Sequence, residues 1–150
     1  MTQRMAYDSF AAGGMKALGG VHAYVAQSGL PQILVELVNL RVSQINGCAY
    51  CLDMHSRALL KDGVPIEKLV LVQAWEEAGP LFTERERAAL AWAETVTRVS
   101  ETGVPDADYA AARAVFGERD LANLTVAIGL INAYNRLAIS FRATPEAARI

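Results

Sequence analysis

Hydrophobic residues recur at helical spacing along most of the chain, and glycine and proline fall between the periodic stretches. Junctions such as Gly63-Val64-Pro65 and Gly103-Val104-Pro105 are typical of helix ends, because glycine closes one helix in a left-handed turn and proline opens the next. The pattern predicts an all-α, single-domain bundle of about seven helices. The expected helices span residues 5–28, 31–46, 48–62, 65–78, 83–102, 106–116 and 120–142.

Local signals refine three of these helices. The run Thr83-Glu84-Arg85-Glu86 has the form of a capping box and predicts a helix start at that point. Asp120 is the expected cap of the last long helix. The pairs Gly13-Gly14 and Gly19-Gly20 indicate that the first helix is kinked or split.

The composition predicts one domain over residues 1–150 that forms a homo-oligomer. Hydrophobic residues make up 53% of the 150 positions and charged residues 20%, which is more apolar surface than one small core hides. The net charge of -2 argues against a nucleic-acid partner. No signal-peptide pattern opens the chain, so we expect a cytoplasmic protein. Polar residues interrupt the apolar stretch 121–141, which predicts a buried or interface helix and no membrane contact.

Cys48 and Cys51 are the only cysteines in the chain, and His55 follows four residues after Cys51. On a helix, offsets of 0, +3 and +7 fall within roughly 60° of arc, so two thiols and an imidazole share one stripe. Cys48 would lie in the first turn, where the positive end of the helix dipole stabilises a thiolate. In a reducing cytosol such a pair is more often catalytic or metal-binding than a structural disulfide.

Glu36 lies in an apolar stretch, where a carboxylate needs a partner. If the chain reverses at Asn46-Gly47, Glu36 and His55 differ in height along the helical hairpin by only about 3 Å at 1.5 Å per residue. A carboxylate in this place would orient the imidazole and raise its basicity. The residues Glu36, His55, Cys51 and Cys48 therefore form a candidate proton relay that ends in a dithiol, although Glu36 could instead pair with Arg41.

This pattern, Glu36-x11-Cys48-x-x-Cys51-x3-His55, resembles the alkylhydroperoxidase D / carboxymuconolactone decarboxylase family in its peroxidase-like branch. The resemblance covers residues 31–100 best. It implies an all-helical fold, assembly into trimers or hexamers, and reduction of peroxides by the four matching residues. Well-studied redox members carry a second histidine between the cysteines, where this chain has Tyr50.

The resemblance implies a thiol-dependent peroxidase whose two cysteines cycle between dithiol and disulfide. A thiolate attacks the peroxide to give a sulfenic acid, the other thiol condenses with it, and an external thiol protein or small thiol reduces the disulfide. No other cofactor is expected. The helix dipole favours Cys48 as the attacking thiol, whereas closeness to His55 and the resemblance favour Cys51, with Cys48 as the exposed resolving thiol.

Several alternatives share these residues. Glu36 and His55 could serve acid–base chemistry in a lyase that acts on a lactone, with incidental thiols, or the disulfide could act as a non-enzymatic redox sensor. The cysteines could be buried packing residues, or could bind zinc together with His55 and Glu36. Tyr50 is a candidate pocket residue, and His22 is expected at the surface or in packing. The sequence assigns Asn132, Asn135 and Arg136 to an intersubunit hydrogen-bond network.

Overall fold

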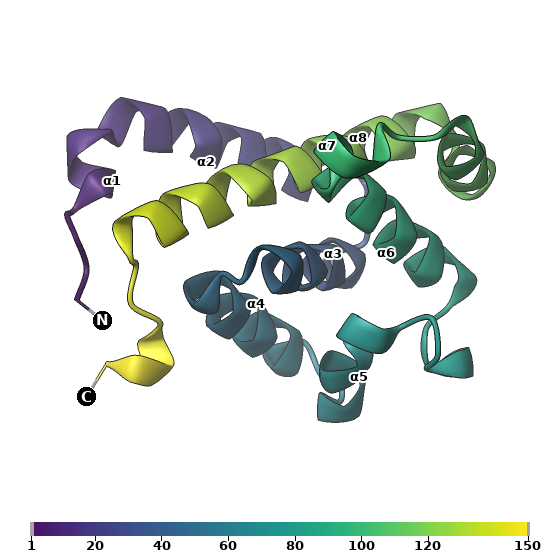
Figure 1. The fold of residues 1–150 in the computed structure, drawn as a ribbon, viewed down its shortest axis with the longest axis horizontal. Helices are drawn as coiled ribbons and strands as arrows, with labels where there is room; N and C mark the ends of the chain where they lie inside the picture. The colour runs from purple at the N-terminus through teal and green to yellow at the C-terminus, as the bar shows by residue number, and fades with distance from the viewer. Residues whose placement is uncertain (1, 150) are drawn as a thin grey trace.

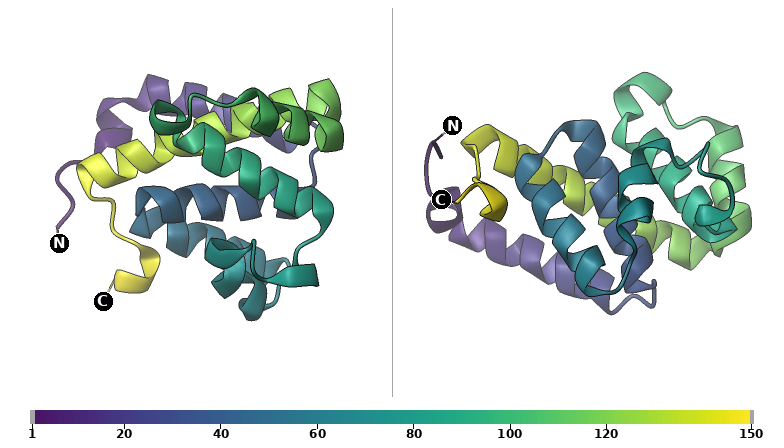
Figure 2. Two further views of the ribbon diagram at one scale, coloured as in Figure 1. Left: turned by 45° about the vertical axis from the view of Figure 1, so that its right-hand side comes forward. Right: turned by 90° about the horizontal axis from the view of Figure 1, so that it is seen from below.

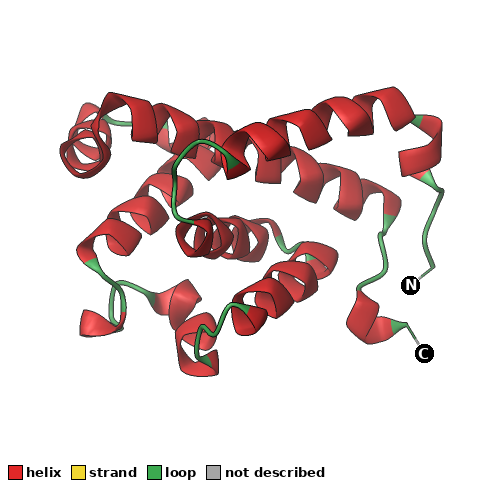
Figure 3. Cartoon of the chain, turned by 180° about the vertical axis from the view of Figure 1, so that it is seen from behind, coloured by secondary structure: helices red, strands yellow, loops and turns green. Residues whose placement is uncertain are grey.

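A computed structural model describes residues 2–149, which are helical with short connections (Figures 1 and 3). In chain order the α-helices are α1 (Tyr7–Phe10), α2 (Ala12–Ala26), α3 (Gln32–Asn46), α4 (Ala49–Lys61), α5 (Ile66–Leu71), α6 (Glu84–Thr97), α7 (Val99–Thr102) and α8 (Asp106–Phe141). Three short 3-10 helices complete the elements: η1 (Val72–Ala74), η2 (Gly79–Leu81) and η3 (Glu146–Ala148). The prediction of an all-α protein is confirmed.

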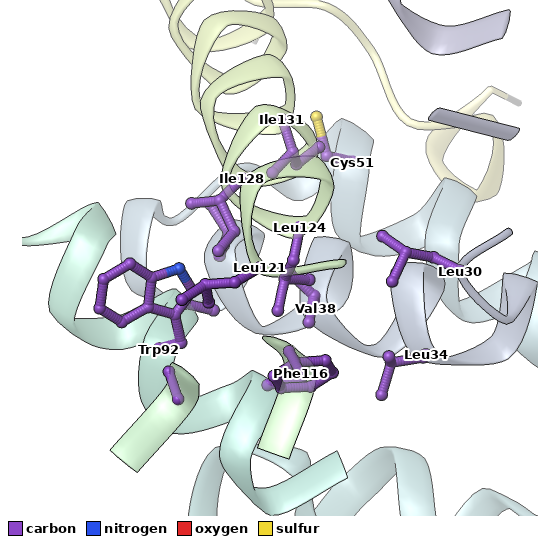
Figure 4. Packing of buried hydrophobic residues seen from close by; sticks show 14 of the residues in the cluster. Leu30, Leu34, Val38, Cys51, Trp92, Phe116, Leu121, Leu124, Ile128 and Ile131 are labelled. Atoms are coloured by element: carbon purple, nitrogen blue, oxygen red, sulfur yellow. The ribbon is translucent and has the colours of Figure 1, made fainter. Parts of the chain in front are cut away.

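Helix α3 lies at the centre of the bundle and contacts α4, α6 and α8. Helices α3 and α4 form a hairpin, while α2 runs along α8 on the opposite side of the molecule (Figures 1 and 2). Two hydrophobic clusters flank α3. One joins α3 to α6 and α8 and includes Cys51 with Leu124 and Ile131 (Figure 4), and the other joins α3 to α4, α5 and η1 around Leu37 and Leu59.

The helix boundaries differ from the prediction where single residues leave helical geometry. The predicted helix 5–28 is split, but at Ala11 and not at the glycine pairs, which all lie inside α2. Residues 65–78 form α5 and η1 followed by turns, and the predicted helix 83–102 breaks at Arg98 into α6 and α7. The capping box is confirmed, because the Thr83 hydroxyl accepts the amide of Glu86 and the Glu86 carboxylate accepts the amide of Thr83.

The two last predicted helices are one kinked helix, α8. Gly117 has φ 69° and ψ -175°, a backbone conformation that only glycine adopts easily, and the chain resumes the helix at once. The prediction that Asp120 caps a new helix is therefore wrong. Asp120 lies inside α8, where its carboxylate accepts a hydrogen bond from Arg85 at 2.6 Å.

Helix α8 and the residues that follow it, up to Ala148, are long and apolar enough by composition to cross a membrane, a test that core helices also pass. In the fold α8 packs against α2, α3 and α6. Its buried residues include the polar Asn123 and Asn135, which have hydrogen-bond partners within the chain. We therefore interpret α8 as a core helix, in agreement with the prediction for residues 121–141.

Candidate active site

The site is built at the tight junction between α3 and α4. Gly47 has φ 69° and ends α3 in a left-handed turn, which directs the amide of Cys48 back to the carbonyl of Ser43 at 3.0 Å. Cys48 is the N-cap residue of α4, one position earlier than the first turn that the sequence predicted. Its Sγ accepts the amide of Cys51 at 3.4 Å, so the helix start stabilises negative charge on this sulfur.

The two thiols are buried and in contact. The Sγ atoms of Cys48 and Cys51 lie 2.7 Å apart, and each residue is only 1% exposed. The hydrogen bond from the Cys51 thiol lowers the pKa of Cys48 to about 7 despite burial, while the same bond and burial raise the pKa of Cys51. The pair therefore loses one proton near neutral pH and keeps the other. Cys48 is as buried as Cys51, so the expectation of an exposed Cys48 is wrong.

Glu36 and His55 meet across the hairpin, as the spacing predicted. The Nδ1 atom of His55 lies 2.7 Å from Oε2 of Glu36, and both side chains are largely buried. Arg41, the alternative partner, pairs with Glu94 instead. A carboxylate at Nδ1 favours the tautomer that carries its proton there, which leaves Nε2 as a proton acceptor.

The Nε2 atom of His55 is the one buried side-chain nitrogen or oxygen without a hydrogen-bond partner in residues 2–149. Over the same residues no direct hydrogen bond joins His55 to either sulfur. The predicted contact between His55 and Cys51 is therefore not a direct one, and a contact through a water molecule stays a prediction. An unpaired acceptor in a buried place is costly for a structural residue, and it is a frequent feature of functional sites.

A polar network under the thiols was not predicted as part of the site. Asn135 of α8 is fully buried and donates to Oγ of Ser43 at 3.1 Å, while its Oδ1 accepts the side chain of Asn46 at 2.9 Å. Hydrogen bonding from Asn135 also lowers the pKa of both Cys48 and Cys51. The sequence placed Asn135 in an intersubunit network, but its partners lie in the same chain.

Asn132 and Arg136 likewise have partners within the chain. Asn132 donates to the Thr97 hydroxyl at 3.2 Å and accepts from Asn46, and Arg136 donates to Asn132. The polar positions on the apolar helix 121–141 were the available sequence signal for this network. Periodicity alone could not show that α8 would place them against the α3–α4 junction.

Tyr50 lies between two cavities that open on different cysteines. A cavity of about 300 Å³ is lined by Cys51, Tyr50, Tyr7 and Tyr134, among others. A second cavity of about 390 Å³ is lined by Cys48 and Tyr50 together with residues from the C-terminal segment. The structure thus places Tyr50 next to both cavities. His22 is exposed and also lines the first cavity.

Residues 2–149 contain no group of three or more histidine, cysteine, aspartate or glutamate side chains placed to hold a metal ion. The zinc alternative therefore lacks a ligand cluster in this part of the chain. The side chains form two separate pairs, Cys48 with Cys51 and His55 with Glu36. Two thiols in contact can form and break a disulfide, and an imidazole paired with a carboxylate can move a proton.

The fold and the site define an all-helical protein with a buried cysteine pair beside a glutamate–histidine pair. The sequence profile of the carboxymuconolactone decarboxylase family matches residues 11–95, and the chain belongs to that family. The family resemblance noted from the sequence is thereby confirmed.

Relatives in two bacteria extend this assignment. The chain is 35% identical over 140 residues to the uncharacterised protein YdfG of Bacillus subtilis, covering 93% of this chain and 95% of that protein. It is 34% identical over 106 residues to the uncharacterised protein YnjA of Escherichia coli, covering 71% and 57%.

Two solved structures have the same fold. One is a protein of unknown function from Agrobacterium tumefaciens that carries the provisional name of antioxidant defence protein AhpD. It superimposes with a TM-score of 0.91 at 40% identity, over 96% of this chain and 98% of that one. The other is an uncharacterised peroxidase-related protein from Silicibacter, with a TM-score of 0.80 at 26% identity over 92% and 73%.

Proposed function

We propose that the protein is a thiol-dependent peroxidase in which Cys48 and Cys51 cycle between dithiol and disulfide. The observation that carries the proposal is the pair of buried sulfurs 2.7 Å apart, one of them with a pKa near neutrality, beside an imidazole whose Nε2 has no partner. Structural cysteines do not need a lowered pKa or an oriented base. The names of the two structural neighbours agree with a role in antioxidant defence.

The proposed reaction begins when one sulfur of the pair attacks the nearer oxygen of a hydroperoxide ROOH. A sulfur–oxygen bond forms, the oxygen–oxygen bond breaks, and the alkoxide RO⁻ takes a proton from the site to leave as ROH. The resulting sulfenic acid is attacked by the other sulfur, which gives the Cys48–Cys51 disulfide and water. Two external thiols then reduce the disulfide by exchange and are themselves oxidised to a disulfide.

Cys51 is the proposed peroxide-reactive sulfur, because it borders the cavity lined by tyrosines. The negative charge of the resting pair lies on Cys48, which caps the helix. The single proton left between the sulfurs can pass from Cys51 to Cys48 along their contact or to His55, and either transfer places the reactive thiolate on Cys51. In this scheme Glu36 orients His55 and stabilises the imidazolium that forms.

The remaining expectations belong to the same proposal. The dithiol needs a thiol protein or a small thiol as reductant and no other cofactor. Assembly into a trimer or hexamer agrees with the apolar side chains that a single chain leaves exposed, such as Phe10 at 81%. A cytoplasmic location would supply the reducing conditions for turnover.

The test is the reaction of the reduced protein with hydrogen peroxide and with cumene hydroperoxide, followed by stopped-flow and by counting free thiols. Two thiols per chain should be lost at a rate well above that of free cysteine. In Cys48→Ser the sulfenic acid should persist on Cys51 and be trapped by a dimedone adduct. If neither Cys48→Ser nor Cys51→Ser yields an adduct, the peroxidase proposal is wrong.

A lyase is the second candidate, since the family that matches residues 11–95 takes its name from a decarboxylase. In that case Glu36 and His55 would do acid–base chemistry and the sulfurs would be dispensable. The same cysteine variants separate the two functions, because serine at either position should abolish the dithiol–disulfide cycle of peroxide reduction and spare a lyase. Slow peroxide turnover with a change of association state on oxidation would instead indicate a redox sensor.

A further inference from the structure

Two of the tyrosines that line the cavity over Cys51 lie outside residues 11–95, the range that matches the family. Tyr7 comes from α1 near the N-terminus, and Tyr134 comes from the last third of α8. Both ends of the chain therefore contribute to the space in front of the proposed reactive sulfur. The cavity, about 300 Å³, is at the small end of the range for ligand pockets.

We propose that Tyr7 and Tyr134 determine substrate specificity at Cys51. Their hydroxyl groups bind the peroxide oxygens, and the apolar walls of the cavity select an organic hydroperoxide with an apolar or aromatic body over hydrogen peroxide. This inference rests on the proposed peroxidase function and adds to it the residues that choose among peroxides.

The hydroxyl groups are available for a ligand. Over residues 2–149 the side-chain hydrogen bonds include none to the hydroxyl of Tyr7 or Tyr134, although Tyr24 binds Asn123 at 2.7 Å. Burial raises the pKa of both Tyr7 and Tyr134, and nearby Tyr50 adds to the effect at Tyr7. Both groups therefore stay protonated near neutral pH and act as hydrogen-bond donors.

Tyr7 is held in place by contacts that join the two ends of the chain. Its ring stacks on Phe141 with centroids 5.2 Å apart and an interplanar angle of 20°. The amide of Arg4 donates to the carbonyl of Phe141 at 2.9 Å, and the Arg4 guanidinium donates to the carbonyl of Ser140 at the same distance. Tyr7 is only partly buried and no residue of α1 belongs to the core, so these contacts fix Tyr7 while its substitution should leave the fold intact.

The other walls fit an apolar substrate. Met15 from α2 and Met54 from α4 line the cavity with the tyrosine rings. Methionine adapts its shape and packs well against aromatic groups. An organic hydroperoxide gains this contact in addition to the hydroxyl donors, whereas hydrogen peroxide has no body with which to make it.

The donors also fit the bond that breaks. When Cys51 takes the nearer oxygen, negative charge develops on the leaving oxygen, and a hydroxyl placed at that oxygen stabilises it until a proton arrives. Stabilisation of the leaving oxygen helps every peroxide, whereas contact with the cavity wall helps only a peroxide that has an apolar body. Removing a hydroxyl and removing a ring should thus have different consequences.

The experiment measures the second-order rate constant of thiol oxidation with cumene hydroperoxide and with hydrogen peroxide. The wild-type protein should favour cumene hydroperoxide by at least about tenfold, the worth of burying a few apolar groups. Tyr134→Phe and Tyr7→Phe should each lower both rate constants by about tenfold, since a hydrogen bond to a charged group is lost. Tyr7→Ala should in addition reduce the preference for cumene hydroperoxide.

Tyr109→Phe is the matched control, because Tyr109 is an exposed tyrosine at the other end of α8. It should leave both rate constants unchanged. Equal rates of the wild-type protein with the two peroxides, or phenylalanine variants that match the control, overturn the inference while the peroxidase function stands. If the wild-type protein loses no thiols with either peroxide, the proposed function fails as well.

Discussion

Two glutamates of the same helical bundle, Glu36 and Glu94, differ in how their buried carboxylates are paired, and Glu36 is the one in the candidate site. Glu94 of α6 accepts hydrogen bonds from Arg41 at 2.7 Å and from Trp75 at 2.9 Å, and Arg98 lies 3.5 Å away. Burial raises its pKa, but the hydrogen bonds from Trp75 and Arg41 outweigh burial and hold the pKa of Glu94 below its ordinary value.

Glu36 pairs with His55, a residue that lacks one hydrogen-bond partner of its own. Its carboxylate meets Nδ1 of His55, and the other ring nitrogen is buried without a partner. The carboxylate of Glu94 has all its hydrogen-bond partners, as a structural group requires, whereas the pair of Glu36 and His55 keeps a buried proton-accepting atom free. The comparison teaches that the unsatisfied atom, more than burial or pairing, distinguishes the candidate site.

The same substitution at both glutamates gives the largest expected contrast. Glu36→Gln should slow thiol oxidation by peroxide about 10²-fold, the lower end of a general-base contribution, since His55 loses its orienting carboxylate. Glu94→Gln should lower the unfolding temperature and leave the rate per folded molecule near the wild-type value. Stopped-flow rates and thermal melts of the two variants measure this, and equal rates in both would remove Glu36 from the mechanism.

Breaking the cluster of Glu94 with Arg41, Trp75 and Arg98 should lower stability and leave the peroxide rate unchanged. Arg41→Ala removes one partner of a buried carboxylate and should reduce the free energy of unfolding by about 3 kcal/mol, the lower end for a broken buried pair, because Trp75 and Arg98 remain. Urea unfolding measures the change. A large fall in the peroxide rate of the folded Arg41 variant, without loss of stability, would contradict the structural role.

The pH dependence of thiol reactivity tests the candidate site through the ionisation of its cysteines. The thiolate fraction rises with pH through the lowered pKa of Cys48, so alkylation by iodoacetamide should accelerate with pH and reach half its plateau rate near pH 7. Asn135→Leu removes a hydrogen bond that lowers this pKa, and should shift the midpoint upward by about one unit, the worth of a hydrogen bond to a charged group.

Asn123→Leu is the matched control for Asn135→Leu, because Asn123 is buried on the same helix and bonds to Tyr24. It should cost stability and leave the midpoint of alkylation near pH 7. A midpoint that does not move in Asn135→Leu would show that Asn135 supports only the fold.

The smallest effect is expected far from both glutamates, at the capping box. Thr83→Ala should lower the free energy of unfolding by about 1 kcal/mol, since one hydrogen bond to the start of α6 is lost. The peroxide rate should stay unchanged. Urea unfolding of Thr83→Ala and Arg41→Ala in the same series tests whether the buried cluster around Glu94 contributes more to the free energy of unfolding than the exposed capping box.

Much of the fold and of the candidate site could be read from the residues in order. Helical periodicity, the capping box at Thr83 and the reversal at Gly47 are local signals, and the structure confirms each of them. The contact between Glu36 and His55 was predictable because, in a tight helical hairpin, the number of residues between a side chain and the turn fixes its height along the helix axis. The kink at Gly117 was read as a helix end, since sequence does not show whether a chain resumes its helix after a glycine.

By itself the sequence determined the elements and the chemistry: an all-α chain, two thiols at helical spacing, and a histidine and a glutamate in register with them. Only the tertiary structure decided what surrounds these groups. It placed Asn135 where it bonds to Ser43 and lowers the pKa of both cysteines, and it paired Arg41 with Glu94. It also placed Tyr7 and Tyr134, from the two ends of the chain, in the wall of a cavity that Cys51 lines. The physical reason is that hydrogen bonds and side-chain spacing along a helix are local, whereas packing between distant helices follows from the close fit of the whole core.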